Sequence, residues 1–391
     1  MKEVFIVGIA RTPIGSFNGS LAGLTAPQLG AAAIKGAMQR AGITPDMVEE
    51  VYMGNVLSAG IGQAPAQQAS IYAGIPTNVP CTTVNKVCAS GMKAIMLGAT
   101  SVMIGTNGLV VAGGMESMSN VPYYLDKARN GYRLGNGQVI DGIIKDGLWD
   151  PYKDFHMGSA AEICAKEYGF TREDQDAYAI ESYKRAEAAA KSGAFDLEII
   201  PVEVPNGKEK ITISVDEEWS KVKYDKIPTL RPAFQKDGTI TAANASKIND
   251  GATAMILASA EKVKELGLKP IAKITGFADA AQAPEWFTTT PSLAVPKALK
   301  MAGVEIKDVD YFELNEAFSV VNLANNKILG IDNNKANVYG GAVSLGHPIG
   351  NSGARIIATL AAVLKNKGGK IGAAGICNGG GGASALVIES V

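Results

Sequence analysis

The sequence contains an internal repeat, and no other feature restricts the possible folds as strongly. Residues 41–48, AGITPDMV, are echoed by residues 302–309, AGVEIKDV. A helical pattern precedes each segment, and a strand pattern ending near an asparagine follows it, at Asn55 in one case and Asn315 in the other. The echo lies between matching elements, which predicts two copies of one structural unit.

Two further markers follow the asparagines in the same order. Cys88 lies 88 − 55 = 33 residues after the first asparagine, and His347 lies 347 − 315 = 32 residues after the second. A small-residue helix pattern follows each marker. Each half then has a strand that runs into a glycine turn, at residues 110–114 and 374–380. Three markers in one order make a chance resemblance between the halves unlikely.

The repeat also predicts how the chain is divided. The stretch between the two copies holds more charge, more aromatic residues and polar turns, which is typical of an insertion that carries substrate-binding loops. We expect an N-terminal half of residues 1–118 and 246–269, an insertion of residues 119–245, and a C-terminal half of residues 270–391. Equivalent loops meet in a pseudo-twofold arrangement, which would bring together Cys88, Asn315, His347 and Cys377.

Composition excludes several classes of protein. With 47% hydrophobic residues, 45 glycines and 6% aromatic residues, the chain resembles a glycine-rich α/β protein and not a disordered or fibrous one. Its formal net charge of −1 gives no reason to expect nucleic acid or an anionic membrane as a partner. The longest apolar runs, such as residues 108–114, are too short to cross a bilayer. Because the sequence starts directly with a strand pattern, we expect a cytoplasmic protein.

Alternating strand and helix patterns predict a largely parallel sheet. The expected strands are residues 3–10, 51–56, 81–84, 109–112, 252–258 and 271–277, and the expected helices are residues 26–41, 64–73, 90–104 and 172–191. Gly42 is expected to end the first of these helices.

Cys88 is the first candidate nucleophile. The small residues after it, in VCASG, leave a sulfur accessible at a strand-to-helix turn. The first amides of a helix stabilise a thiolate, so we expect its pKa to be depressed. The alternative is a buried structural cysteine, which is the commoner role for a cysteine considered alone and fits Cys81 well.

His347 is the candidate base. A glycine precedes it and a proline follows it, in LGHPIG, which is a poor setting for a core histidine and suits an imidazole held on a rigid turn. Such a group can take a thiol proton and later donate to a thioester oxygen. The second histidine, His156, lies in the insertion, and no catalytic role is expected for it. Four cysteines without a CxxC pair and only two histidines make a structural metal site improbable.

Cys377 is the second candidate thiol, in ICNGGGG. Consecutive glycines after a strand let the backbone approach a ligand and offer N–H groups to a developing oxyanion. The run lacks the ending of a phosphate-binding loop, and no dinucleotide-binding pattern is present. One thiolate can hold an acyl group, while the other, with a pKa near neutrality, can remove a proton from a carbon acid. This pair favours carbon–carbon bond chemistry on thioesters.

These segments resemble the three motifs of the thiolases, and residues 315–318, NEAF, resemble a fourth. The resemblance runs from residues 11–15 to the last strand. It implies the thiolase fold, two pseudo-twofold related α/β halves in a five-layered αβαβα core with a loop-domain insertion. Asn315 stands where the ketosynthases, which share this fold, have a second histidine.

The resemblance implies an acetyl-CoA acetyltransferase. His347 would activate Cys88 to take an acetyl group from acetyl-CoA, and Cys377 would remove a proton from a second acetyl-CoA, giving acetoacetyl-CoA and CoA. Asn315 would hold a water that forms one oxyanion site with His347, and the backbone N–H groups of Cys88 and Gly379 would form the other. Loss of one such donor typically costs about 2.7–4 kcal/mol of transition-state stabilisation.

Within the family, the insertion is most similar to that of the mitochondrial-type acetoacetyl-CoA thiolases. By this resemblance the residues contacting CoA would be Tyr183, Lys221, Val222, Lys223, Lys226, Ser246, His156, Met157, Leu148, Phe234, Ala317 and Phe318. A potassium site would be lined by Tyr183, Ala242, Ala243, Ala245 and Val343, although no cofactor is required for the chemistry. The lysines have an alternative interpretation as solvated surface residues. This chain has Thr288 after Phe287 where the branch has a proline, so the branch's acceptance of 2-methyl-branched substrates is not carried over.

Three alternatives differ from this hypothesis. The enzyme could be a broader 3-ketoacyl-CoA thiolase of β-oxidation, a choice that depends on the bulk of Met157, Trp286 and Phe287. The chain could also be an acyl-CoA-binding protein without activity, or a scaffold in a multienzyme assembly. The family resemblance further implies a homotetramer built as a dimer of dimers, or a dimer.

Overall fold

The structure, a computed structural model that describes residues 1–391, repeats one order of strands in its two halves. In the first half the order is β4 (Cys81–Val84), β3 (Glu50–Gly54), β5 (Leu109–Ser117), β12 (Asn249–Ser259) and β1 (Val4–Arg11). In the second half β14 (Tyr311–Leu314), β15 (Ile371–Asn378), β16 (Gly382–Ser390) and β13 (Ala272–Ala281) take the places of β3, β5, β12 and β1. The duplication inferred from the sequence is confirmed.

The two halves join through the edge strands β1 and β13, which pair over only three residues on each strand, from Val4 opposite Ile274 to Ile6 opposite Ala272. Each of these strands also has a register shift at a glycine, Gly8 in one and Gly276 in the other. A Cβ atom on Gly8 would lie 2.4 Å from the carbonyl oxygen of Ala37, and one on Gly276 would lie 2.3 Å from that of Ala298. The two glycines therefore allow the same close approach of helix to strand in both halves.

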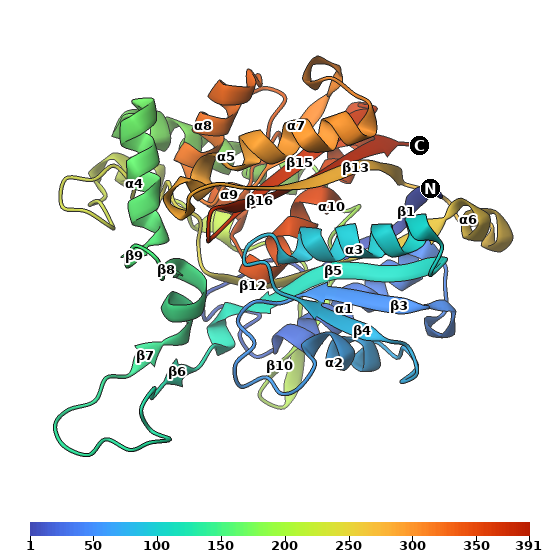
Figure 1. Ribbon diagram of the computed structural model, residues 1–391, viewed down its shortest axis with the longest axis horizontal. Helices are drawn as coiled ribbons and strands as arrows, with labels where there is room; N and C mark the ends of the chain where they lie inside the picture. Colours follow the sequence, from blue (N-terminus) through green and yellow to red (C-terminus); the bar gives the residue numbers. More distant parts are fainter.

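Figure 1 shows five layers, from α7 through the strands β13, β16 and β15, the helices α10 and α3, and the strands β12, β5 and β3, to α1 and α2. The helices are α1 (Ala26–Ala41), α2 (Pro65–Tyr72), α3 (Ser90–Ile104), α7 (Pro291–Ala302), α8 (Ser319–Leu329) and α10 (Ile349–Lys367). One buried apolar cluster includes residues of α3, α10 and the sheets on both sides of them. The expected αβαβα architecture is confirmed.

The expectation of a largely parallel sheet is wrong. Only the pairs β3–β4, β3–β5 and β14–β15 are parallel. The strands β12 and β16 run antiparallel to both of their neighbours. In the second half, β16 runs antiparallel to β15 because a tight turn after β15 returns the chain beside the strand it has just left.

The glycines at the end of the first repeat also differ from expectation. We predicted a glycine turn at Gly113 and Gly114, but both lie inside β5. A Cβ atom on Gly113 would lie 2.0 Å from the carbonyl oxygen of Thr253, and one on Gly114 would lie 2.2 Å from that of Gly350. These positions need glycine for close backbone contact with a strand and a helix, and not for a change of chain direction.

Helix patterns were the most reliable part of the prediction. The helices α1, α3 and α5 (Arg172–Lys191) have the predicted bounds. Gly42 and Gly303, which stand at equivalent positions of the repeat, end α1 and α7 with φ values of 71° and 70°. This left-handed conformation favours glycine, so the two Ala-Gly echoes mark the same helix end.

The insertion leaves the core after β5 and returns at β12. It contains β6 (Tyr123–Tyr124), β7 (Ile140–Asp141), the π-helical turn η3 (Ile144–Leu148), β8 (Trp149–Asp150), β9 (Phe155–His156), α4 (Met157–Tyr168), α5, β10 (Val202–Asn206), β11 (Glu209–Ile213), η4 (Glu218–Lys221) and η5 (Tyr224–Thr229). The helices α4 and α5 pack against α8. The β6–β7 hairpin projects away from the body (Figure 1).

The remaining elements are short. They are β2 (Gly15–Ser16), η1 (Pro45–Met47), η2 (Met118–Asn120), α6 (Ala260–Leu266), η6 (Pro284–Thr289), η7 (Ile306–Asp308) and α9 (Ala342–Leu345). One window, Val87–Ile104, is apolar and long enough by composition to cross a membrane, contrary to the sequence analysis. Of this window 67% is buried within the protein, as is typical of a core helix.

Candidate active site

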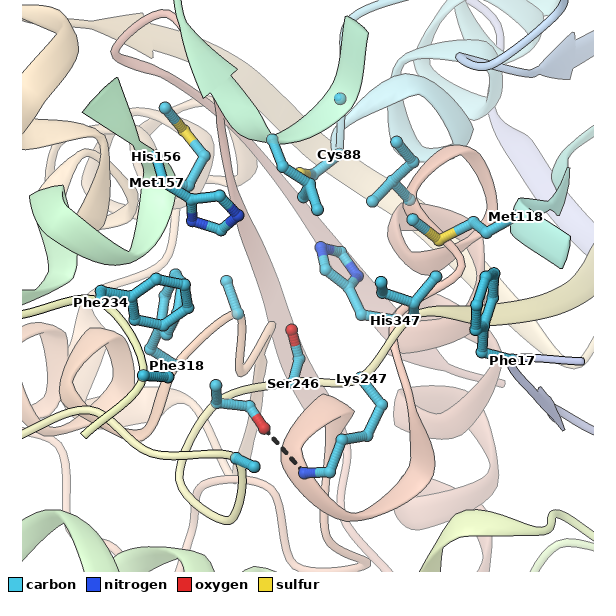
Figure 2. Close-up of a pocket in the computed structure, with 18 of the residues that line it drawn as sticks. Phe17, Cys88, Met118, His156, Met157, Phe234, Ser246, Lys247, Phe318 and His347 are labelled. Carbon is cyan, nitrogen blue, oxygen red and sulfur yellow. Dashed lines mark hydrogen bonds between the residues drawn. The ribbon is translucent and has the colours of Figure 1, made fainter. Parts of the chain in front are cut away.

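Close packing of α3 against α10 assembles the site. A Cβ atom on Gly91 would lie 2.9 Å from the backbone nitrogen of Ala354, and one on Gly353 would lie 2.6 Å from that of Met92. The first turns of the two helices therefore touch, and the residues just before them come together. Cys88 and His347 line one cavity of about 560 Å³, in which the His347 ring points toward Cys88 (Figure 2).

The turn that presents Cys88 is strained and firmly held. Val87 has a φ of 47°, which is rare for a β-branched residue and costs on the order of 1–3 kcal/mol. The Ser90 hydroxyl donates to the carbonyl oxygen of Val87 at 2.6 Å and accepts from the backbone N–H of Lys86 at 2.8 Å. These contacts fix the sulfur at the start of α3.

Burial raises the pKa of the Cys88 thiol to about 11, although the backbone N–H groups of Gly379 and Cys88 oppose this effect. The expectation of a depressed pKa is therefore wrong for the free protein, because the lost hydration of this half-buried thiol outweighs the amides at the helix start. The same N–H groups are the pair proposed to stabilise an oxyanion, and they do lie near this sulfur. At neutral pH the thiol is protonated.

His347 is 5% exposed, and its hydrogen bonds fix one tautomer. Its Nδ1 lies 2.6 Å from the Ser352 hydroxyl, which donates its own proton to the carbonyl oxygen of Pro348 at 3.0 Å. Because that hydroxyl then accepts at Nδ1, the proton of the ring is on Nδ1 and the lone pair is on Nε2. The Nε2 atom is buried and has no hydrogen-bond partner.

Burial and the nearby charge of Arg355 lower the pKa of His347 to about 3. The imidazole is therefore neutral throughout the physiological range. With a protonated thiol and a neutral imidazole facing each other, the free site holds no thiolate–imidazolium pair. It is arranged for general-base catalysis, in which the proton moves as the sulfur attacks.

Cys377 lies at the end of β15 with an exposed fraction of 0%, inside the apolar cluster that contains Met157, Phe287 and Phe318. Burial raises the pKa of its thiol well above the ordinary value, and a charge on Cys88 would raise it further. A pKa near neutrality, which we expected for a base, is not found in the free protein. A thiolate formed here would be a strong base, so a bound substrate must provide the acidity.

Asn315 follows β14 and is 1% exposed, yet neither polar atom of its side chain has a hydrogen-bond partner within the chain. Nearly all buried amides in proteins are hydrogen-bonded, to protein or to ordered water. The unpaired amide therefore provides both a donor and an acceptor for a water, the role that the sequence resemblance implies.

Eight of the residues expected to contact CoA line the cavity: Leu148, His156, Met157, Lys221, Phe234, Ser246, Ala317 and Phe318. Tyr183 does not line it, because the side chain is 3% exposed and packs against Val343. Val222 and Lys223, between η4 and η5, and Lys226, within η5, lie outside the cavity. Trp286, expected at the acyl pocket, does not line the cavity either.

Three of the residues predicted to bind potassium, Tyr183, Ala245 and Val343, lie around a lysine side chain. The ammonium of Lys247 donates to the carbonyl oxygen of Ala245 at 2.9 Å, the dashed line in Figure 2, and to that of Val343 at 3.4 Å. It lies 5.5 Å from the ring centre of Tyr183. The residues present therefore do not fit a potassium ion. Burial lowers the pKa of Lys247 to about 8, which leaves the ammonium protonated at neutral pH.

The sequence analysis missed two polar residues of the site, Ser352 and Lys247. Each left a signal that was overlooked. Ser352 is a hydroxyl five residues after His347, within the first turn of α10. Lys247 is a cation directly after the segment expected to bind another cation.

Comparison with known proteins agrees with the fold and the motifs. The model of the thiolase N-terminal domain matches residues 4–261, and that of the thiolase C-terminal domain matches residues 268–390. Acetyl-CoA acetyltransferase 1 of Arabidopsis thaliana is 59% identical, with 99% of this chain and 94% of that protein covered. A cytosolic acetyl-CoA acetyltransferase of Gibberella zeae is 58% identical, with 100% and 99% covered.

Two solved structures superpose over the whole of both chains. A thiolase from Ascaris suum in complex with coenzyme A has a TM-score of 0.95 and is 48% identical. The acetyl-CoA acetyltransferase from Syntrophomonas wolfei has a TM-score of 0.97 and is 39% identical. The duplicated halves, the facing thiol and imidazole, and these full-length matches lead to one conclusion: the chain belongs to the thiolase family.

Proposed function

We propose that the enzyme is an acetyl-CoA C-acetyltransferase, which reversibly condenses two acetyl-CoA molecules to acetoacetyl-CoA and CoA. One observation carries the proposal: the thiol of Cys88 and the unpartnered Nε2 of His347 line one cavity, and the thiol of Cys377 is buried beside it. Relatives at 58–59% identity are named for this activity.

In the first half-reaction the Cys88 sulfur attacks the thioester carbon of acetyl-CoA while its proton moves to Nε2 of His347. The backbone N–H groups of Cys88 and Gly379, which already face this sulfur, stabilise the oxyanion of the tetrahedral intermediate. As the intermediate collapses, the carbon–sulfur bond to CoA breaks and the Cys377 thiol gives its proton to the leaving thiolate. His347 keeps the proton that it took from Cys88. Cys88 then carries the acetyl group.

In the second half-reaction the thiolate left on Cys377 takes an α-proton from a new acetyl-CoA molecule. The developing enolate oxygen accepts hydrogen bonds from His347 and from a water held by Asn315, which lowers the barrier to this proton transfer. The carbanion attacks the acetyl carbon on Cys88 and forms the carbon–carbon bond. The Cys88 sulfur leaves and regains its proton from Nε2 of His347, and acetoacetyl-CoA is released.

The lining of the cavity favours a short acyl group. Met157 and Phe287 lie in one apolar cluster with Cys377, and Phe287 is 3% exposed. Bulky side chains at this position leave little depth for a long chain beyond the thioester. The alternative of a broad-chain 3-ketoacyl-CoA thiolase requires space that these residues fill.

The chain-length profile of thiolysis tests this choice. We expect kcat/KM to be highest for acetoacetyl-CoA and to fall steeply as the 3-ketoacyl chain lengthens. Faster cleavage of 3-ketohexadecanoyl-CoA than of acetoacetyl-CoA would favour the broad-chain enzyme. Absence of any thiolysis would favour a binding protein on the same fold.

Assembly and location are part of the proposal. We expect a cytoplasmic homotetramer, and a relative from Gibberella zeae is named cytosolic. The projecting β6–β7 hairpin exposes apolar side chains that an oligomer would cover: Tyr123, Leu125, Leu134 and Val139. Placement in the mitochondrial-type branch rests on the CoA-binding and potassium-binding segments alone, and the lysine among the latter departs from that pattern.

A further inference from the structure

Lys247 lies in the wall of the cavity, where the sequence analysis expected a potassium ion. Of the five residues expected to surround a potassium ion, Ala245 and Val343 accept from the lysine ammonium through their carbonyl oxygens. The ring of Tyr183 covers the same group. A cation of single charge is therefore already supplied by the chain, at the place where the ion would lie.

Nearby charges suit this arrangement. The carboxylates of Glu218 and Glu316 are the negative groups that favour a charge on Lys247. Neither forms an ion pair with it, and both accept hydrogen bonds from other residues. Glu316 accepts from the backbone N–H of Val343 at 3.1 Å, and Glu218 accepts from the side chain of Asn249 at 3.1 Å. The ammonium thus lies in a negative field without being displaced toward either carboxylate.

The contacts of Lys247 link two parts of the site. Ala245 belongs to the loop of residues 241–247, of which Ser246 lines the cavity, whereas Val343 lies in α9, four residues before His347. Two residues beyond Lys247, the side chain of Asn249 accepts from the backbone N–H of His347 at 2.9 Å. The same short segment therefore holds the cavity wall and the turn that presents the base.

We propose that the Lys247 ammonium is a built-in cation that takes the place of potassium and acts as a positioning residue, holding the 241–247 loop against α9 and the His347 turn. It does not touch the reacting atoms. The enzyme then needs no potassium. The effect on catalysis rests on the proposed function, but the cation preference is a property of the fold and is measured separately.

The test compares the wild type with Lys247→Ala in KCl and in NaCl at equal ionic strength. We expect the wild type to have the same melting temperature, kcat and KM in both salts. In Lys247→Ala the vacated carbonyls are free to bind an ion. We therefore expect a lower melting temperature and a KM for CoA thioesters raised by roughly tenfold in NaCl, with partial recovery of both in KCl.

Two further variants serve as controls. Lys247→Met fills the space without a charge or a hydrogen-bond donor. KCl should therefore not restore the melting temperature or the KM of this variant. Lys327→Ala removes a lysine in a similar setting away from the cavity, since Lys327 donates to the carbonyl oxygen of Tyr168 at 3.2 Å and lies 5.4 Å from the ring centre of Phe170. This variant should keep the wild-type KM in both salts.

Three results would overturn the proposal. They are a wild type that is stabilised or activated by KCl over NaCl, a Lys247→Ala variant with no response to potassium, and a Lys247→Met variant that recovers in KCl. The comparison of the wild type in KCl and in NaCl tests the proposal even if Lys247→Ala fails to fold. An inactive wild type whose melting temperature is equal in both salts would overturn the proposed function and leave the cation inference standing.

Discussion

The two halves share an asparagine at one backbone position and differ at the position beside it. In the first half Gly54 pairs with Gly114, and in the second Leu314 pairs with Gly375. Counting from these pairs, Asn55 corresponds to Asn315, and Glu116 corresponds to Cys377. The duplicated backbone thus presents an asparagine beside an acid in one half and beside a thiol in the other.

The first of these pairs is hydrogen-bonded within the chain, although Oδ1 of Asn55 has no partner. The side-chain amide of Asn55 donates to Glu116 at 2.7 Å. Glu116 also accepts from the backbone N–H groups of Val56, Leu57 and Gly350 at 3.1, 3.2 and 2.9 Å. These contacts fasten the first half to the start of α10.

The second pair is left open. Both polar atoms of Asn315 lack partners, and the thiol of Cys377 is buried among apolar side chains. The comparison shows that duplication supplied one scaffold twice. The half in which neither polar atom of the asparagine has a partner is the half that we propose does chemistry at these positions. Unpaired polar atoms in a buried setting lower the stability of the folded state, which makes them a marker of function.

The largest effect is expected for Cys377→Ala, which removes the proposed base of the open pair. Condensation and thiolysis should fall by at least roughly 10⁴-fold, because proton removal from carbon has no other acceptor. The melting temperature should change little, since a small side chain replaces another. Steady-state rates and a thermal melt check both expectations. Retention of more than a few per cent of activity would contradict the assignment of the base.

Asn315→Ala should reduce kcat by about 10²–10³-fold, the usual effect of removing one oxyanion donor. Its side chain has no partner within the chain, so the free energy of unfolding should be nearly unchanged. Rates and denaturant unfolding on the same preparation separate the two effects. A large loss of stability with unchanged kcat would mean that Asn315 is structural.

Asn55→Ala is the matched variant in the hydrogen-bonded pair, and the opposite split is expected. The lost hydrogen bonds should lower the free energy of unfolding by about 1–3 kcal/mol, because Glu116 then loses a buried donor. The kcat of the folded enzyme should stay within a few fold of the wild type. If Asn55→Ala and Asn315→Ala behave alike, the contrast between the halves is wrong.

The smallest effect concerns the protonation of Cys88. Burial raises the pKa of this thiol to about 11. At pH values below this pKa, the thiolate fraction should therefore rise tenfold with each unit increase in pH. Alkylation of Cys88 by iodoacetamide should therefore accelerate about tenfold from pH 7 to 8 and again from pH 8 to 9. Cys88→Ala, labelled in parallel, gives the background. A plateau near pH 7 would indicate a preformed thiolate–imidazolium pair.

Much of the fold followed from local patterns. The bounds of α1, α3 and α5 agree with helical periodicity, and Gly42 with Gly303 marked equivalent helix ends. Sheet direction did not follow, because the orientation of β12 and β16 depends on where the chain returns and not on their own residues. Gly113 and Gly114 were misassigned because a glycine needed for close contact looks the same in sequence as a glycine in a turn.

The site was predictable to a similar degree. Cys88, His347 and Cys377 were recognisable because glycines and small residues around them match no core pattern. Their pKa values were not predictable, because segments far away in sequence bury Cys377 completely and leave Cys88 only partly exposed. Ser352 and Lys247 act through hydrogen bonds that only the folded chain reveals.

The central claim is that the first half supplies the thiol that carries the acyl group and the open pair of the second half does the carbon chemistry. Peptide mass spectrometry after incubation with acetyl-CoA tests it most directly. We predict one acetyl group on the peptide containing Cys88 in the wild type, its accumulation in Cys377→Ala, and its absence in Cys88→Ala. An acetyl group on Cys377, or an adduct that persists in Cys88→Ala, would contradict the account.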